Sequence, residues 1–390
     1  MQLIAPPLAL YVHMPWCVKK CPYCDFNSHG VRGEPPYAGY VDALLADLDA
    51  DRNDFGEALH DRPIISVFFG GGTPSLFSPD LIARFLAGAR ARLPFAEDCE
   101  ITLETNPGTV EHGRFDGYLA AGVNRISFGI QSFDDSKLKR LGRIHSSAEA
   151  EAAVKSAQDA GLQNINLDLM YALPEQNVSG ALHDVDRAVA LQPTHISHYQ
   201  LTLEPNTVFA AHPPPLPDDD TAWAMQEACE AQLAESGYAQ YEISAYAQAG
   251  RRCAHNLNYW RFGDYLGIGA GAHGKLTDAA AGEVLRRWKT RHPNAFLEAA
   301  GMPARIGGHA AVPTDELPFE YMLNALRLID GAPLDDFTVR TGLPAEHIAA
   351  RLAAGRQRGW LENDPHVLRT TPLGQRFLND VIASFLGQAK

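Results

Sequence analysis

The sequence predicts an α/β fold: an incomplete (β/α)6 barrel, followed by a mostly helical, winged-helix-like C-terminal domain. Two observations predict it. Short apolar segments alternate with longer amphipathic segments between residues 9 and 201, and the composition changes past about residue 310. Such alternation is typical of βα units that build a parallel sheet. With 390 residues and ~150 residues per domain, we expect a barrel domain over residues 1–300 and a second domain over residues 310–390.

The expected elements of the barrel follow in order along the chain. Each expected helix is amphipathic and long enough to cross over and cover the sheet. The expected strands are Ala9–His13, Ile64–Phe69, Glu100–Glu104, Arg125–Ile130, Ile165–Met170 and His195–Leu201. The expected helices between them include Tyr40–Asp51, Asp80–Leu93, Ser147–Ala160 and Gly180–Leu191. About six βα units result, fewer than the eight of a complete barrel.

A segment rich in proline follows the last of these strands. His212–Asp220 contains four prolines and then three aspartates, which predicts a surface connection. The elements expected after it are a helix at Thr221–Ser236, a strand at Tyr241–Tyr246, helices at Glu316–Leu328, Leu334–Thr341 and Pro344–Arg358, and a last helix at Thr371–Leu386. Asn363-Asp364-Pro365 predicts a hairpin between Trp360–Glu362 and Val367–Arg369.

Composition and charge exclude several classes of function. The chain is 46% hydrophobic, and no segment approaches the ~18 consecutive apolar residues of a membrane helix. It has 47 Asp and Glu residues against 33 Lys and Arg residues, a net charge of -14. Such a surface repels phosphate backbones unless basic residues are concentrated somewhere, and we identify no such patch. We therefore expect no integral membrane segment and no nucleic-acid partner.

Three of the six cysteines form the motif Cys17-x-x-x-Cys21-x-x-Cys24, in the loop after the first expected strand. Three thiolates can hold three of the four irons of a 4Fe-4S cluster, whereas clusters that only carry electrons usually have four cysteine ligands. The remaining iron can then chelate the amino and carboxylate groups of S-adenosylmethionine. A Cys₃His zinc site with His13 or His29 is the alternative. The other cysteines are scattered, so a metal site in a reducing cytoplasm is expected.

Polar residues stand at the carboxyl ends of the expected strands, where the active sites of βα barrels lie. Gly70-Gly71-Gly72-Thr73-Pro74 follows the second strand, Glu104 ends the third, Gln131 ends the fourth, and Asp168 lies in the fifth. Two carboxylates and an amide suit the hydroxyls and amines of a nucleoside and an amino acid, and Arg143 suits a carboxylate. Their common position after the cysteine loop indicates one ligand site.

These motifs resemble the radical SAM superfamily and, within it, the family of oxygen-independent coproporphyrinogen III dehydrogenase. The resemblance covers nearly the whole chain and includes Tyr11-x-His13-x-Pro15-x-Cys17 and Leu-Asp-Leu-Met-Tyr around Asp168. It implies a 4Fe-4S cluster on the three cysteines, with Tyr11 packed beside it. The residues that it implies as contacts of S-adenosylmethionine are Tyr11, Tyr23, Gly71, Gly72, Thr73, Glu104, Gln131, Arg143 and Asp168, with Gln200 and His273 as weaker matches.

Two departures from the dehydrogenase pattern favour the haem-chaperone branch of this family, HemW. Phe26 stands where the dehydrogenase has a further cysteine, and the first strand begins by residue 9, without the dehydrogenase's preceding segment. That branch also carries a His-Asn-x-x-Tyr-Trp motif, present here at residues 255–260. The resemblance therefore implies haem as a ligand, with His255 as axial ligand and Tyr259 and Trp260 against the porphyrin. Without the resemblance, His255 is more typical of a structural histidine.

The preferred interpretation is a haem chaperone that uses the cluster and S-adenosylmethionine and passes haem to an acceptor protein of unknown identity. The alternative is the dehydrogenase reaction, in which a deoxyadenosyl radical abstracts hydrogen from a porphyrinogen propionate. Radical modification of RNA is disfavoured by the net charge. DNA binding through Pro344–Arg358 is disfavoured because packing against the barrel explains that helix better.

Overall fold

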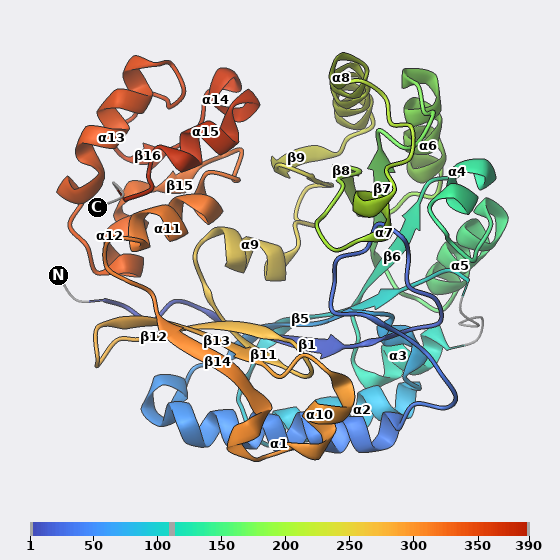
Figure 1. Ribbon diagram of the computed structural model, residues 1–390, viewed down its shortest axis with the longest axis horizontal. Coiled ribbons are helices and arrows are strands. Elements are labelled where there is room, and N and C mark those ends of the chain that lie inside the picture. Colours follow the sequence, from blue (N-terminus) through green and yellow to red (C-terminus); the bar gives the residue numbers. More distant parts are fainter. Residues whose placement is uncertain (1–2, 109–113, 388–390) are drawn as a thin grey trace.

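The computed structural model describes residues 3–108 and 114–387 and contains one curved sheet of twelve strands (Figure 1). The strand order is β14-β13-β12-β11-β1-β4-β5-β6-β7-β8-β10-β9. Seven neighbouring strands are parallel: β11 (Asp264–Ile268), β1 (Leu8–Met14), β4 (Ile64–Gly71), β5 (Phe95–Thr105), β6 (Arg125–Gln131), β7 (Asn164–Tyr171) and β8 (His195–Gln200). Six of these are the strands expected from the sequence, so the incomplete barrel is confirmed.

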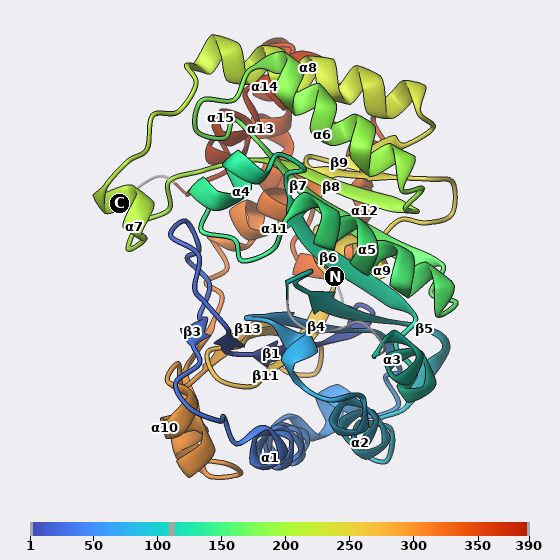
Figure 2. The same ribbon diagram turned by 90° about the vertical axis from the view of Figure 1, so that its right-hand side faces the viewer.

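The parallel strands are apolar because both faces of the sheet are covered. In β1, six of the seven residues are buried, and such strands have near-continuous apolar sequences. Helices cover the outer face (Figures 1 and 2). These helices are α1 (Tyr37–Phe55), α2 (Pro79–Arg90), α3 (Phe115–Ala121), α5 (Ser147–Asp159), α6 (Val178–Ala190) and α8 (Asp219–Glu235). The main hydrophobic core lies between these helices and the sheet.

Local sequence signals set the starts of these helices. Ser146 and Glu149 form a capping box at the start of α5. At the start of α2, the Ser78 side chain accepts a hydrogen bond from the Leu81 N–H, and Pro79 is the first helical residue. Such caps satisfy backbone N–H groups that have no partner inside the helix. The short elements in the connections are β2 (Trp16–Cys17), β3 (His29–Gly30), α4 (Asp135–Arg140), α7 (Val208–Ala211), α9 (Ala254–Trp260), α10 (Pro293–Glu298) and the 3₁₀ helices η1 (Gly56–Leu59), η2 (Pro74–Leu76) and η3 (Pro303–Arg305).

Both edges of the sheet differ from the sequence-based expectation. On one edge, β11 is followed by three antiparallel strands that were not predicted, β12 (His273–Asp278), β13 (Glu283–Lys289) and β14 (Ile306–Ala311). Two of them contain buried lysines, Lys275 and Lys289, which obscure the apolar pattern of a strand. On the other edge, the single strand expected at Tyr241–Tyr246 is two short strands, β9 (Ala239–Glu242) and β10 (Ala245–Ala247).

The C-terminal residues form helices around a second hydrophobic cluster, into which Phe262 and Val284 also pack. The helices are α11 (Leu317–Ala325), α12 (Leu334–Thr341), α13 (Glu346–Gln357), α14 (Pro372–Arg376) and α15 (Leu378–Ala383). The predicted hairpin is present in a short form: an antiparallel bridge joins Leu361 to Thr370, and the Glu362 N–H donates to the Arg369 carbonyl oxygen over 3.0 Å. The strand β16 (Val367–Leu368) pairs in addition with β15 (Ala332–Pro333), which was not predicted. The last predicted helix is interrupted at Phe377, whose backbone is not helical. The division near residue 310 stays a prediction.

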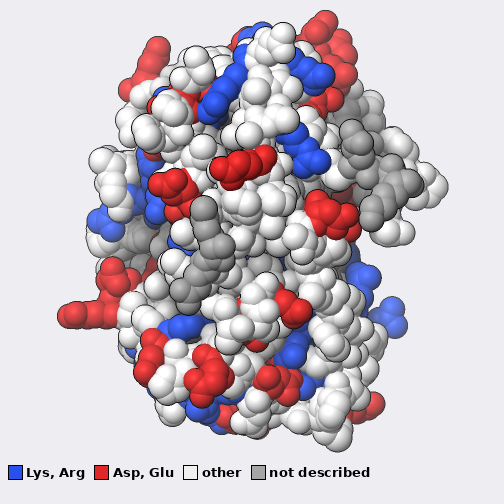
Figure 3. All heavy atoms as spheres, turned by 90° about the vertical axis from the view of Figure 1, so that its left-hand side faces the viewer, with Lys and Arg blue, Asp and Glu red and all other residues white. Residues whose placement is uncertain are grey.

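The surface shown in Figure 3 includes the side of the molecule with the C-terminal helices. Its Lys and Arg side chains are interspersed with Asp and Glu side chains. Within residues 3–108 and 114–387, no helix has the length and apolar character needed to cross a lipid bilayer.

Candidate functional site

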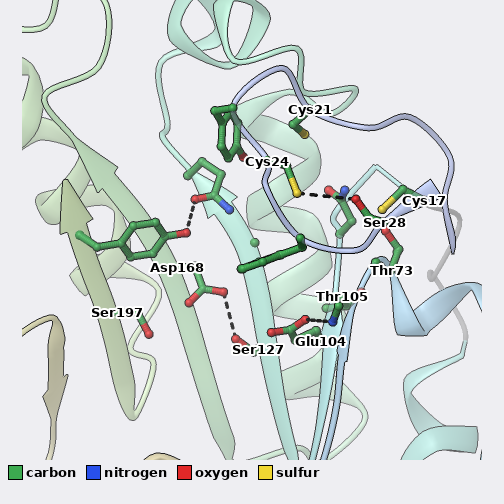
Figure 4. Close-up of a pocket in the computed structure, with 18 of the residues that line it drawn as sticks. Cys17, Cys21, Cys24, Ser28, Thr73, Glu104, Thr105, Ser127, Asp168 and Ser197 are labelled. Carbon is green, nitrogen blue, oxygen red and sulfur yellow. Dashed lines mark hydrogen bonds between the residues drawn. The ribbon is translucent and has the colours of Figure 1, made fainter. Parts of the chain in front are cut away.

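The cysteine loop and the carboxyl ends of β4 to β8 surround a cavity of about 340 Å³ (Figure 4). This volume lies in the range of ~300–1,000 Å³ that is usual for small-molecule sites. In Figure 4 the cysteines lie at one end of the cavity, and Glu104 and Asp168 lie at the other. The predicted site residues in its lining are Cys17, Cys21, Tyr23, Cys24, Gly71, Gly72, Thr73, Glu104, Gln131, Arg143, Asp168 and Trp260.

A short parallel ladder between β2 and β3 closes the cysteine loop. The His29 N–H donates to the Pro15 carbonyl oxygen over 2.7 Å, and the Val31 N–H donates to the Cys17 carbonyl oxygen over 2.9 Å. Within the loop, the Cys24 N–H donates to the Cys21 carbonyl oxygen. All three thiols are free and partly exposed. The ladder therefore presents three unpaired thiols to the cavity.

Polar groups surround the three thiols. Burial raises the pKa of Cys17, and hydrogen bonds with Thr73 and Ser28 act in the opposite direction. The Cys24 sulfur lies 3.6 Å from the Ser28 hydroxyl. The Cys21 sulfur accepts a hydrogen bond of 3.6 Å from Arg143. Donors of this kind stabilise thiolate over thiol, which is the form that binds a metal.

His13 cannot complete a zinc site with these cysteines. Its Nδ1 lies 3.0 Å from the Tyr11 hydroxyl and its Nε2 lies 2.9 Å from the Asn27 carbonyl oxygen, so both nitrogens have partners. Among the described residues, no three Cys, His, Asp or Glu side chains are grouped so as to hold one metal ion. A 4Fe-4S cluster takes one cysteine per iron, so three separated thiols suit a cluster better than a single zinc ion.

Glycine is required where β4 ends and the next loop begins. Gly71 has φ 106°, and a Cβ there would lie 2.4 Å from the His13 ring. A Cβ on Gly72 would lie 2.5 Å from the Trp16 carbonyl oxygen. The Gly72 N–H donates to the Met14 carbonyl oxygen over 2.7 Å. The absence of side chains therefore allows this loop to pack directly against β1 and β2, beneath the cysteines.

The register of the sheet places the carboxyls of Glu104 and Asp168, which line the cavity, among hydroxyls. Glu104 on β5 pairs with Ser127 on β6, and Asp168 on β7 pairs with Ser197 on β8. Asp168 accepts hydrogen bonds from the Ser127 hydroxyl over 3.0 Å and from the Asn166 amide over 2.8 Å. Glu104 accepts a hydrogen bond from the Gly71 N–H over 3.2 Å. Both carboxyls are therefore held at the same level along the strands of the sheet.

The two carboxyls resist ionisation together. Burial, with a smaller effect from the charge of Asp168, raises the pKa of Glu104 to about 8. Burial also raises the pKa of Asp168, against the hydrogen bonds that it accepts. A cation in the cavity would favour the ionised form of both groups. The site is therefore suited to a ligand with positive charge and hydroxyl groups.

Arg143 brings a cation to the part of the cavity next to Cys21. Its guanidinium donates to the Asn106 side-chain oxygen and to the Gly129 carbonyl oxygen. Its Nε is buried and has no hydrogen-bond partner among the described residues. Nearby, the Gln131 side-chain oxygen accepts a hydrogen bond of 2.9 Å from the Tyr199 hydroxyl. A carboxylate on a ligand would satisfy the unpaired Nε–H of this arginine.

Three residues expected at this site lie outside the cavity lining. Tyr11 is stacked on Phe68, and its hydroxyl lies 3.0 Å from Nδ1 of His13. Gln200 is exposed at the end of β8, and Tyr199 lines the cavity instead. Successive side chains of a strand point to opposite faces, so only one of the two can do so. His273 is exposed at the start of β12.

The structure does not bring His255 to the cavity. His255 lies on α9, on the inner side of the sheet, and is 2% exposed. Its Nδ1 lies 2.9 Å from the Ser66 hydroxyl and its Nε2 lies 3.0 Å from the Tyr259 hydroxyl. Both nitrogens have partners, so the prediction of His255 as an axial haem ligand does not fit this geometry. Tyr259 is also outside the lining, whereas Trp260 is part of it.

Sequence reasoning missed several polar residues of the lining. They are Ser127, Ser197, Tyr199, Glu242, Ser244 and Asn256. Ser127 pairs with Glu104, and Ser197 pairs with Asp168, on neighbouring strands. Tyr199 lies two residues after Ser197, on the same face of β8. Because side chains alternate between the two faces of a strand, this alternation could have identified all three residues. Asn256 belongs to the His-Asn-x-x-Tyr-Trp motif, so its neighbourhood was singled out, although the residue itself was not assigned to the site. Glu242 and Ser244 come from a segment after the barrel strands, where no sequence signal points to the cavity.

Comparisons with known proteins agree with this architecture. Residues 11–188 match the family model of the Radical SAM superfamily, and residues 312–377 match that of the HemN C-terminal domain. The chain is 50% identical to "Heme chaperone HemW" of Escherichia coli (strain K12), over 98% of this chain and 99% of that protein. It is 49% identical to the HemW protein of Haemophilus influenzae, over 98% of both. The chain belongs to the HemW family.

A solved structure shows that this HemW family member has the HemN fold. Coproporphyrinogen III oxidase (HemN) from Escherichia coli, a radical SAM enzyme, superposes on 98% of this chain and 90% of its own with a TM-score of 0.81. The sequence identity is 22%, so the similarity concerns the fold. The match extends over the barrel and the C-terminal helices together.

Proposed function

We propose that this member of the HemW family is a haem chaperone that binds a 4Fe-4S cluster and S-adenosylmethionine, receives haem and passes it to an acceptor protein. One observation carries the cofactor part of the proposal. Three free thiols, two carboxyls and an arginine with an unpaired N–H line the same cavity. The haem part is supported by the HemW relatives, which are named haem chaperones and match nearly the whole chain.

The cavity residues divide between the two cofactors. Cys17, Cys21 and Cys24 would hold three irons, and a bound cluster would supply one iron with an open coordination position. The unpaired Nε–H of Arg143 would bind the carboxylate of S-adenosylmethionine. Glu104 would accept hydrogen bonds from amino or hydroxyl groups.

The other residues that we propose to contact S-adenosylmethionine are either held in place by neighbouring side chains or form the rest of the cavity lining. Asp168 is held by Ser127 and Asn166, and Gln131 is held by Tyr199. Tyr23, Gly71, Gly72 and Thr73 complete the lining next to the cysteines. Fixed partners keep these side chains in place before a ligand binds, which lowers the ordering cost of binding.

We propose the cytoplasm as the site of this function, because three partly exposed free thiols that hold a cluster need a reducing compartment. The haem acceptor is proposed to be another protein, and nucleic acid is not an expected partner.

An anaerobic haem titration tests the proposed function. The protein with a reconstituted cluster should bind haem near stoichiometrically, as measured by its Soret band. The same preparation should not convert coproporphyrinogen III at an enzymatic rate. Robust formation of protoporphyrinogen IX would instead support the dehydrogenase reaction, and the absence of a Soret band would contradict the chaperone proposal.

The same preparation tests the cluster ligands. Replacing Cys17, Cys21 and Cys24 together by Ala should abolish the brown chromophore and the EPR signal of the reduced cluster. Cys99 and Cys229 are the controls, because both are buried and burial raises the pKa of each to about 12. Their Ala variants should keep both signals, and stoichiometric zinc without iron in the wild type would contradict the cluster.

A further inference from the structure

A chain of hydrogen bonds leads from Asp168 in the cavity lining into the interior of the barrel. Asn166 lies two residues before Asp168 on β7 and is buried. Its side-chain amide donates to one carboxylate oxygen of Asp168 over 2.8 Å and to the Ser127 hydroxyl over 2.8 Å. Ser127 donates to the other carboxylate oxygen over 3.0 Å (Figure 4). Each oxygen of Asp168 therefore has one donor from the protein.

His195 on β8 fixes the orientation of the Asn166 amide. The two residues are opposite each other in the parallel pairing of β7 and β8. Nδ1 of His195 lies 2.6 Å from the Asn166 side-chain oxygen, and the Ser197 hydroxyl donates to the same oxygen over 3.1 Å. A flipped amide would turn its NH₂ group toward these donors and its oxygen toward the Asp168 carboxylate. The donors on its oxygen therefore keep the NH₂ group directed at Asp168.

The second nitrogen of His195 sets the position of the imidazole proton. Nε2 lies 2.8 Å from the hydroxyl of Tyr241 on β9. That oxygen accepts a hydrogen bond from the Cys253 N–H over 3.3 Å, so its own hydrogen is available to Nε2. Burial, with a smaller effect from the charge of Arg125, lowers the pKa of His195 well below its ordinary value. A neutral imidazole that accepts at Nε2 carries its proton on Nδ1, which faces Asn166.

We propose that His195 is a positioning residue for S-adenosylmethionine, because it holds Asp168 through the Asn166 amide. This inference rests on the proposed function, in which Asp168 contacts that cofactor. An ionised carboxylate has about four acceptor positions, and the protein's two donors occupy only part of them. The others remain for hydroxyl or amino groups of the ligand. His195 is fully buried and outside the cavity lining, so it acts on the ligand only through its neighbours.

A matched pair of substitutions separates the hydrogen bond of His195 from its packing. His195→Asn keeps a donor close to the Nδ1 position, whereas His195→Leu has a similar shape and no donor. Both lose the contact with Tyr241. Anaerobic equilibrium dialysis with S-adenosylmethionine measures the affinity of each protein after cluster reconstitution. We expect His195→Leu to bind about five- to tenfold more weakly, the effect of one lost hydrogen bond, and His195→Asn to stay within about twofold of the wild type.

Two outcomes of this comparison would overturn the proposal. One is equal affinity in the wild type and His195→Leu, and the other is an equal loss in both variants. His198→Leu is the control for packing, because His198 is also buried on β8 but stacks on Tyr171, with the ring centroids 4.7 Å apart. Its affinity should stay as in the wild type. A loss as large as that of His195→Leu would reflect a destabilised strand and also overturn the proposal.

A double substitution tests whether His195 acts through Asn166. In an Asn166→Ala background, His195→Leu should cause no further loss of affinity, because the amide that His195 holds is gone. Urea unfolding of the same proteins measures their stability, which His195→Leu should still lower in this background. A further loss of affinity of about fivefold, as in the wild-type background, would show that His195 acts by another route and would contradict the proposal.

The imidazole proton itself can be observed in the wild type. ¹⁵N NMR of protein with labelled histidine should show His195 as a neutral ring protonated at Nδ1, with its signals assigned by their absence in His195→Asn. A proton on Nε2, or a charged ring at neutral pH, would overturn the proposal even if His195→Leu does not fold. A wild type that shows the expected ring and binds no S-adenosylmethionine would instead contradict the proposed function.

Discussion

Glu104 is a half-buried carboxyl in the cavity lining, and its ionisation makes the cavity sensitive to pH. Its pKa in the folded protein is about 8, against an ordinary value of 4.5, mainly because of burial. The folded state therefore holds this proton more tightly than the unfolded state does, and stability should fall as pH rises from about 4.5 to 8. Each pKa unit corresponds to ~1.4 kcal/mol, so this one group should contribute a loss of a few kcal/mol.

We expect Glu104→Gln to reduce the loss of stability between pH 6 and pH 9 in protein without cluster. The amide cannot ionise, so the variant avoids the cost of a buried charge at high pH. Urea unfolding of both proteins at the two pH values measures the difference. Glu97→Gln is the matched control, because Glu97 is exposed and its replacement should leave the pH dependence as in the wild type. Equal pH slopes in wild type and Glu104→Gln would contradict the raised pKa.

Single residues of the site differ in how well the sequence predicts them. Glu104 and Asp168 could be predicted because strand ends of a parallel sheet meet at one edge, and their residue types suit a ligand. The position of His255 could not be predicted in the same way. Its two nitrogens are occupied by Ser66, which is distant in sequence, and by Tyr259, one helical turn away. A motif shows which residues are near each other, but not which atoms remain free.

At the scale of elements, a buried ion network joins α1 to the unpredicted edge of the sheet. Lys289 on β13 donates to Asp47 over 2.6 Å and to Asp51 over 2.8 Å, both on α1. Arg305 at the end of η3 donates to the same two carboxylates, over 2.9 Å in each case. All four side chains are almost fully buried. The edge strands are therefore held by paired charges as well as by apolar contacts.

We expect Lys289→Met to destabilise the protein by ~3–5 kcal/mol, the usual cost of breaking a buried ion pair. Asp47 would then keep Arg305 as its cation, and Asp51 would keep Arg305 and the partly exposed Arg287. The control is Lys155→Met on α5, where a pair with Asp159 is exposed and should contribute ~0.5 kcal/mol or less. Urea unfolding measures both variants. Similar changes in both would show that the network contributes no more than a surface ion pair.

The same network explains which elements the sequence could predict. The barrel strands are apolar over most of their length and are separated by amphipathic helices, so both signals are local. The strands β12 and β13 depend on Lys275 and Lys289, which are buried beside Asp264 and α1. Burial of a lysine requires a partner from elsewhere in the fold. The partner cannot be identified from the strand itself, so the strand is missed.

At the scale of the whole molecule, one side chain joins the C-terminal helices to the cavity. Arg327, just after α11, donates to Glu242 on β9 over 3.1 Å. Its guanidinium also lies over the ring of Trp260, 4.3 Å from the centroid. Glu242 and Trp260 both line the cavity. The sequence predicts the helices and the barrel separately, but this contact joins residues 85 positions apart and leaves no local signal.

Loss of the contacts that Arg327 makes with Glu242 and Trp260 should make the cavity wall more mobile, without unfolding the barrel or the C-terminal helices. Arg327→Ala leaves the Glu242 carboxylate, whose side chain is 3% exposed, without its cation, and an unpaired buried group costs ~1–3 kcal/mol. We therefore expect faster amide hydrogen exchange in β9 and α9 and weaker binding of S-adenosylmethionine. Arg358→Ala is the matched control, because Arg358 stacks on Trp360 within the C-terminal helices and not against the barrel. It removes a comparable cation–π contact, so exchange in β9 and α9 should stay as in the wild type. Equal exchange in the two variants would mean that Arg327 does not hold the cavity wall.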